Sequence, residues 1–193
     1  VIRLWAVVDG RCLKEWQGHT HIVQDLKFSP DGKFLASSSH DETLRLWDLA
    51  SLRCCHTWFC AASDVSPVAF GPNNRILASP GRNFTVNLWD IVTGNLFHVL
   101  LGHTSNIRGL AFHPDGTKLY RSSEDISLGV WDVHWGQPVE FHQGYLNRVQ
   151  ALTFGRDDGE LCTSSTVSGI QRWTISDSIE VRPIDAITNS SVV

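Results

Sequence analysis

The chain has 193 residues, a formal net charge of −4, 42% hydrophobic residues and 19% charged residues. This length and composition suit a folded domain with a buried core and exclude a disordered chain. The acidic balance and the scattered Lys and Arg residues argue against direct binding of nucleic acid. No apolar run approaches the roughly 20 residues of a membrane helix, so we expect no membrane span.

The first predicted element is a strand at the N-terminus, residues 1–5, with the sequence VIRLW. The chain starts inside this strand and contains no methionine. We therefore expect a truncated or mature piece, or the product of an incomplete gene model. The lack of a targeting signal at this end is consequently uninformative.

Tryptophan recurs along the whole chain at intervals of 42 residues, at Trp5, Trp47, Trp89, Trp131 and Trp173. Phenylalanine keeps the same interval at a second position, and its members are Phe28, Phe70, Phe112 and Phe154. Two residue types repeating at one fixed spacing predict a repeat architecture, in which each period forms one supersecondary unit.

One period contains the pattern of four short antiparallel strands. A strand at 23–28 leads into the turn Ser29-Pro30-Asp31-Gly32, and a second strand at 33–38 ends in a polar turn around Asp41. The segment 43–47 alternates with period two, and an outer strand follows at 53–58. Because no segment has helical spacing, the sequence predicts an all-β fold made of four-stranded propeller blades.

The motifs Gly18-His19 and 35–48, which ends in Trp47-Asp48, resemble the signature of the WD-repeat family. The resemblance covers residues 1–174 and implies a WD-repeat β-propeller with repeats at 10–48, 52–90, 94–132 and 136–174. At 42 residues per period we expect about four complete blades plus part of a fifth, an open arc of a larger ring whose remaining blades are missing from this chain. Residues 175–193 are expected to hold an outer strand at 179–183 and a polar tail.

His19, Ser37 and Asp41 are residue types of a hydrolase triad, and they are the first candidates for chemistry. The family resemblance implies a different role. With Trp47 they form a buried chain of hydrogen bonds from indole to hydroxyl, imidazole and carboxylate. A repeated internal network offers no exposed nucleophile and no oxyanion pocket. We therefore expect a structural network and no catalytic residue.

The other repeats depart from this network. The second has Ala61, Ser79, Asn83 and Trp89; the third has His103, Arg121, Asp125 and Trp131; the fourth has Tyr145, Thr163, Val167 and Trp173. Arg121 stands where the first repeat has a serine. We expect it to turn outward or to pair with Asp125, and we expect Arg121→Ser to raise the melting temperature.

Alternate turns of an antiparallel meander lie at the same end, so the Gly-His loop and the Asp41 turn share one face. Related propellers bind peptides on this face. The exposed positions implied by the resemblance are Gln24, His40, Ser66, Arg82, Arg108, Glu124, Gln150 and Thr166. Their chemistry varies between blades, as a binding surface requires, although solvated turn tips would vary as well. Arg82 and Arg108 are the first pair to test.

The resemblance therefore implies a non-catalytic scaffold that binds partner peptides or domains. Two alternatives remain, a component of a ribonucleoprotein or RNA-processing complex and a substrate receptor of a ubiquitin ligase. The Trp-Asp-x-Arg motif linked with such receptors is absent, which weakens the latter.

The cysteine pattern bears on metals and on location. The five cysteines are an odd number, and the cluster at 54–60 lacks a second ligand pair, so we expect no metal and no cofactor. Such usage favours a reducing compartment, either cytoplasmic or nuclear.

Overall fold

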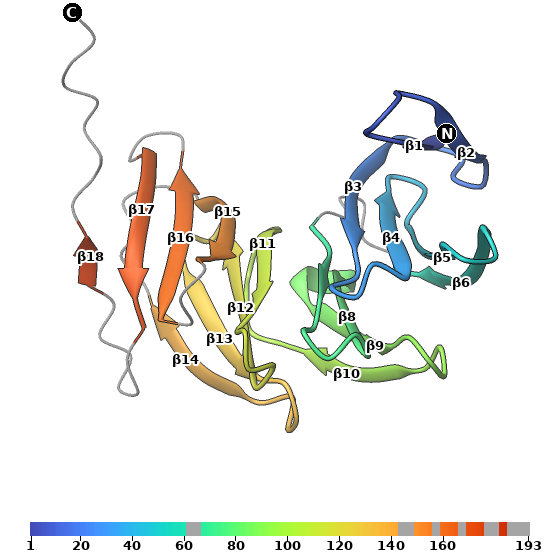
Figure 1. Ribbon diagram of the computed structural model, residues 1–193. Coiled ribbons are helices and arrows are strands. Elements are labelled where there is room, and N and C mark those ends of the chain that lie inside the picture. Colours follow the sequence, from blue (N-terminus) through green and yellow to red (C-terminus); the bar gives the residue numbers. More distant parts are fainter. Residues whose placement is uncertain (61–66, 143–148, 156–158, 166–168, 176–181, 185–193) are drawn as a thin grey trace, which may run out of the picture.

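The chain folds into five antiparallel sheets in the computed structural model (Figure 1), which describes residues 1–60, 67–142, 149–155, 159–165, 169–175 and 182–184. The first sheet has two strands and is called here the half-sheet: β1 (Ile2–Trp5) and β2 (Cys12–Trp16). Each of the other four sheets has four strands and forms one blade. The fold is thus all-β, as the sequence predicts.

The four blades follow one another along the chain. Blade 1 consists of β3 (Val23–Phe28), β4 (Phe34–Ser39), β5 (Thr43–Asp48) and β6 (Arg53–Phe59). Blade 2 consists of β7 (Ala69–Phe70), β8 (Ile76–Pro80), β9 (Val86–Asp90) and β10 (Leu96–Leu100), with a single turn η1 (Arg82–Phe84) between β8 and β9. Blade 3 consists of β11 (Ile107–Phe112), β12 (Lys118–Ser123), β13 (Leu128–Asp132) and β14 (Pro138–His142). Blade 4 consists of β15 (Val149–Phe154), β16 (Glu160–Ser165), β17 (Gly169–Thr174) and β18 (Arg182–Ile184).

The repeating tryptophan occupies the same place in every blade. It lies in the third strand, opposite a leucine of the second strand, in the pairs Leu35↔Trp47, Leu77↔Trp89, Leu119↔Trp131 and Leu161↔Trp173. The period of 42 residues in the sequence is therefore the spacing of one blade. Register is held because a slip by one residue would turn each indole to the opposite face of its sheet.

The core is divided among the contacts between neighbouring sheets. Blades 1 and 2 share one cluster that includes Leu44 and Leu77, and blades 2 and 3 share another that includes Leu88 and Leu119. Blades 3 and 4 share a third, and a small cluster joins the half-sheet to blade 1 through Ile2 and Trp47. This is the packing of a propeller, in which each sheet stacks face to face on the next.

The blades form an arc, with the half-sheet at one end and blade 4 at the other (Figure 1). The half-sheet holds only the last two strands of a blade, as expected from the first period. At the other end, an outer strand is present in blade 4 at Arg182–Ile184 and pairs Pro183 with Trp173. It overlaps the predicted strand at 179–183, of which residues 179–181 lie outside the described residues. The predicted polar tail lies outside the described residues. Among the described residues, none forms a helix long and apolar enough to cross a membrane.

Candidate functional site

In blade 1 a chain of hydrogen bonds links β4, β5, the turn between them and the loop before β3. The Trp47 indole Nε1 donates to the Ser37 hydroxyl at 2.8 Å, and this hydroxyl lies 2.7 Å from His19 Nε2. His19 Nδ1 lies 2.8 Å from the Asp41 carboxylate. Asp41 also accepts from the Thr43 hydroxyl at 2.6 Å and from the Thr20 backbone N–H at 2.9 Å. The hydrogen bonds expected from the resemblance are all present in this repeat.

The protonation of this network follows from its donors and acceptors. Because an ionised carboxylate only accepts, His19 Nδ1 carries the proton and Nε2 accepts from Ser37. Burial lowers the pKa of His19 despite the nearby Asp41, so the imidazole is neutral at neutral pH. Burial would raise the pKa of Asp41, but the hydrogen bonds from Thr43, Thr20 and His19 outweigh it and hold that pKa well below its ordinary value.

The same geometry argues against catalysis at Ser37. The side chain is fully buried, and its oxygen already accepts a hydrogen bond from the Trp47 indole N–H. A nucleophilic serine needs a substrate within reach and donors for the developing oxyanion. Ser37 instead holds the second and third strands of the blade together.

Blade 3 repeats only the outer part of this network. His103 Nδ1 lies 2.8 Å from Asp125, which also accepts from the Ser127 hydroxyl at 2.5 Å and from the Thr104 backbone at 2.9 Å. The inner part is broken, because Arg121 replaces the serine. His103 Nε2 is buried and has no hydrogen-bond partner among the described residues.

Arg121 does not behave as the sequence suggested. It neither turns outward nor hydrogen-bonds Asp125; it is fully buried. Its two terminal nitrogens donate to the carbonyls of Leu100 at 3.0 Å and Leu101 at 2.7 Å, and its guanidinium carbon lies 3.3 Å from the centre of the Trp131 ring. Burial lowers the pKa of Arg121 to about 9, so the group stays charged at neutral pH. The expectation failed because backbone carbonyls and an aromatic face can hold a buried guanidinium without a carboxylate, although its Nε has no hydrogen-bond partner among the described residues.

The glycine of each Gly-His pair, Gly18 or Gly102, lies against the tryptophan of its blade. Gly102 has φ +137°, and a Cβ atom there would lie 2.5 Å from Phe141 and 3.0 Å from Trp131. A side chain at this position would therefore be strained in its backbone and would also collide with two rings. The Gly-His pair is needed for close approach of the loop to the tryptophan.

In blades 2 and 4 the described residues include the bond from tryptophan to hydroxyl. The Trp89 indole donates to Ser79 at 3.0 Å, and the Trp173 indole donates to Thr163 at 2.8 Å. In blade 2, Asn83 replaces the aspartate and takes a left-handed backbone conformation. Three residues of these expected sets, Ala61, Tyr145 and Val167, lie outside the described residues.

The loops at one end of the blades carry the predicted contact positions. The His40 N–H donates to the Ile22 carbonyl, and the Glu124 N–H donates to the Asn106 carbonyl, both at 2.9 Å. In blades 1 and 3 these bonds connect the turn between the second and third strands to the loop before the first strand. We call this end, with the turns holding His40, Arg82 and Glu124, the loop face.

On the loop face, the two positions predicted in blade 1 contact one another, and so do the two in blade 3. Gln24 lies in hydrogen-bonding contact with His40. Arg108 donates to Glu124 from Nε at 3.0 Å and from a terminal nitrogen at 2.6 Å. In these two blades a residue of the first strand and a residue of the turn between the second and third strands therefore form a pair, Gln24 with His40 in blade 1 and the ion pair of Arg108 with Glu124 in blade 3.

Blade 2 presents a different surface. Arg82 is exposed in η1, and Phe84 beside it is exposed with φ +62°. A bulky residue in the left-handed region is unusual and marks a turn under local strain. Phe84 could not be predicted as a contact residue, because the residue types around it do not indicate a left-handed phenylalanine. Of the remaining predicted positions, Gln150 is exposed, and Ser66 and Thr166 lie outside the described residues.

The described residues contain no group of three or more His, Cys, Asp and Glu side chains placed to hold a metal ion. The five cysteines, at positions 12, 54, 55, 60 and 162, are free thiols. Cys60 is buried 3.6 Å from the Ser79 hydroxyl, and burial raises the pKa of its thiol to about 11. It therefore packs as a small apolar side chain.

Comparison with known proteins identifies the repeat. The family model described as WD domain, G-beta repeat matches residues 10–48, 52–90 and 94–132, which make up more than half of the chain. WD-repeat proteins are generally protein-interaction scaffolds.

Individual relatives match over about one repeat. A stretch of 42 residues is 45% identical to the nuclear distribution protein PAC1 of Arthroderma otae and covers 22% of this chain and 9% of that protein. A stretch of 40 residues is 50% identical to PAC1 of Coccidioides posadasii, covering 21% and 8%. A stretch of 44 residues is 46% identical to WD repeat and SOCS box-containing protein 1 of Xenopus tropicalis, covering 22% and 10%. The matches span about a tenth of these relatives, so the likeness is one of repeat units.

Proposed function

Because the chain belongs to the WD-repeat family, we propose that it is a non-catalytic scaffold that binds partner proteins through its loop face. The partner is a peptide or a domain that spans the turns of several blades. The function belongs inside the cell, in the cytoplasm or the nucleus, which is consistent with five free thiols.

The observation that carries this proposal is the contrast between a framework that repeats from blade to blade and loop-face residues that differ between blades. Tryptophan, its opposing leucine and the turn hydrogen bonds repeat from blade to blade. The residues on the loop face differ: a glutamine–histidine pair in blade 1, an exposed arginine with a phenylalanine in blade 2, and an ion pair in blade 3. A repeated scaffold with non-repeated tips offers one partner several distinct contacts.

Arg82 is expected to contribute more to binding than Arg108. The guanidinium of Arg108 already donates to Glu124, so a partner gains less from it. Arg82 is exposed beside Phe84, and arginine and aromatic residues are common among the residues that dominate binding energy.

The test compares variants of the full chain in quantitative affinity capture from source cells. Arg82→Ala combined with Arg108→Ala should remove specific partners that the wild-type chain retains, with the melting temperature unchanged. Arg75→Ala is the matched control, because Arg75 is an exposed arginine that pairs with Asp90 at 2.9 Å in the turns at the opposite end of blade 2. If the double variant and the control retain the same partners as the wild type, binding does not use the loop face.

A further inference from the structure

The turns between the second and third strands of blades 1, 2 and 3 share a left-handed residue. Glu42, Phe84 and Ile126 are one period apart, and their φ angles are +64°, +62° and +62°. Each follows the aspartate position of its repeat and lies in a turn of the loop face. The left-handed region suits glycine, asparagine and aspartate, and it is an outlier for a bulky or β-branched residue. Phe84 and Ile126 therefore hold a conformation that opposes their own residue type.

The side chains of Phe84 and Ile126 pack little against the described residues. Phe84 is 42% exposed and Ile126 is 47% exposed. Neither contributes to the four buried clusters of the described residues. The turns are held by polar contacts instead: the buried Thr85 hydroxyl donates to the Arg82 carbonyl, and the buried Ser127 hydroxyl donates to Asp125. These bonds fix the backbone and leave the two strained apolar side chains outside the fold.

The exposure of these two side chains belongs to the interior of the arc. Blades 2 and 3 each lie between two other four-stranded sheets (Figure 1). What adjoins either end of the arc therefore has no bearing on Phe84 or Ile126.

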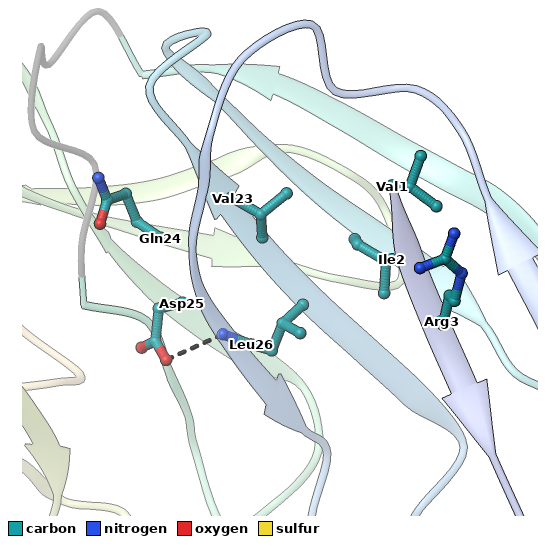
Figure 2. Close-up of a pocket in the computed structure, with 7 residues that line it drawn as sticks. All are labelled: Val1, Ile2, Arg3, Val23, Gln24, Asp25 and Leu26. Atoms are coloured by element: carbon teal, nitrogen blue, oxygen red, sulfur yellow. Dashed lines mark hydrogen bonds between the residues drawn. The ribbon is translucent and has the colours of Figure 1, made fainter.

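The exposed turns differ from the hollows of the surface. One pocket of about 400 Å³ lies between β1 and β3 (Figure 2), and another of about 350 Å³ lies among β3, β7, β11 and β15. Neither pocket is lined by Phe84 or Ile126. Because small molecules bind in concave sites, two side chains that stand on exposed turns fit a polypeptide ligand better.

The charges in the same two turns indicate what such a ligand carries. Arg82 is exposed in the turn of Phe84 and has no ion-pair partner among the described residues. In the turn of Ile126 the corresponding residue is Glu124, which is already paired with Arg108 at 2.6 Å. The described residues thus leave the charge of Arg82 uncompensated, and a carboxylate of a ligand complements it.

We propose that the turns of blades 2 and 3 bind an acidic, apolar peptide segment of a partner protein. A carboxylate of the segment pairs with Arg82, and apolar side chains beside it pack on Phe84 and Ile126; we call these three residues of the chain the tip residues. The proposal rests on the scaffold function and names the chemistry of its partner. Partner binding explains why the chain places two apolar residues where they otherwise only weaken the fold.

The probe is a peptide that is selected from a random phage-displayed library on the immobilised full chain and then synthesised with a fluorescein label. We expect the selected sequences to contain an acidic residue flanked by apolar residues, and the peptide to bind saturably in an anisotropy titration. Arg82→Ala, Phe84→Gly and Ile126→Gly should each weaken binding about tenfold. Failure to enrich such sequences would overturn the proposal.

The glycine variants separate binding from folding. Glycine adopts a positive φ freely, so Phe84→Gly and Ile126→Gly should keep or raise the melting temperature while they lose the peptide. Glu42→Gly is the matched control, because Glu42 has nearly the same φ in blade 1 but an acidic side chain. It should bind the peptide as the wild type does. A lower melting temperature with unchanged binding for the two glycine variants would assign both side chains to the fold and contradict the proposal.

A charge exchange tests the pairing with Arg82. Arg82→Glu should reject the selected peptide and bind a version in which lysine replaces the acidic residue. If the peptide is lost on Arg82→Ala combined with Arg108→Ala but is bound normally by both glycine variants, the loop face binds partners through other contacts and only this inference fails. If it binds every variant equally, the peptide site lies away from the loop face, which counts against the proposed function as well.

Discussion

Blades 1 and 3 both contain the Gly-His loop, the Asp turn and the buried tryptophan, and within this network one buried position changes from a serine to an arginine. In blade 1, Ser37 connects indole and imidazole. In blade 3, Arg121 stacks on the indole and reaches past it to the end of β10, in the preceding blade. The Trp131 indole then donates to the Leu101 carbonyl at 3.1 Å. The first network holds one blade together, whereas the second also joins two blades.

This difference shows that the shared residues do not determine where the polar bonds go. A side chain of seven heavy atoms fits a position that holds a serine elsewhere, because the loop carbonyls accept its donors and the indole packs on its plane. The arginine leaves the histidine without one hydrogen bond: His103 Nε2 has no partner among the described residues, whereas His19 Nε2 contacts the Ser37 hydroxyl.

The largest effect is expected from converting blade 3 to the pattern of blade 1. Arg121→Ser should lower the free energy of unfolding by about 3 kcal/mol, because a serine leaves a cavity and cannot reach the Leu100 carbonyl. Chemical denaturation measures it. Arg121→Lys, which keeps the charge and reaches one carbonyl, should lose less. An increase in stability for Arg121→Ser would restore the expectation drawn from sequence.

A smaller effect is expected from breaking blade 1. Ser37→Ala should cost about 2 kcal/mol, because the Trp47 N–H and His19 Nε2 both lose their partner. Ser79→Ala in blade 2 is the matched control. It removes the same acceptor from Trp89 where no histidine depends on it, so it should cost about 1 kcal/mol. Equal losses at the two serines would mean that the bond to His19 contributes nothing.

The smallest effect is expected from pH. Burial lowers the pKa of His19 and His103, so the unfolded chain binds more protons than the folded chain once the pH falls below the ordinary histidine value of 6.5. Stability is then full above this value and falls as the pH drops through it. Thermal melts at pH 7.5, 6.5 and 5.5 should show the decline. Replacing both histidines by asparagine should flatten it, and an unchanged slope would assign the effect to other groups.

The sequence predicted the features that depend on period. The spacing of 42 residues located the third strand of every blade, since each tryptophan falls within it. The motif of the first repeat also predicted the bonds among His19, Ser37 and Asp41. Such features depend on the local residue pattern and on strand register, and both can be read from a single sequence.

The sequence could not predict features that depend on distant backbone atoms. The partners of Arg121 are carbonyls about 20 residues away, at the end of a strand in another blade. The contact of Gln24 with His40 and the exposure of Phe84 depend on how two turns approach each other and on a left-handed backbone. Residue types do not encode these arrangements.

The sharing of each core cluster between two neighbouring sheets has a consequence for unfolding. Since each buried cluster of the described residues lies between two neighbouring sheets, the stability of a blade depends on its interfaces with its neighbours, as in a one-dimensional array. Among the described residues, eleven buried side chains join blades 2 and 3, whereas four join the half-sheet to blade 1. Hydrogen exchange should therefore be fastest in β1 and β2 and slowest in the centre of the arc, with opening spreading inward from its weakly held end.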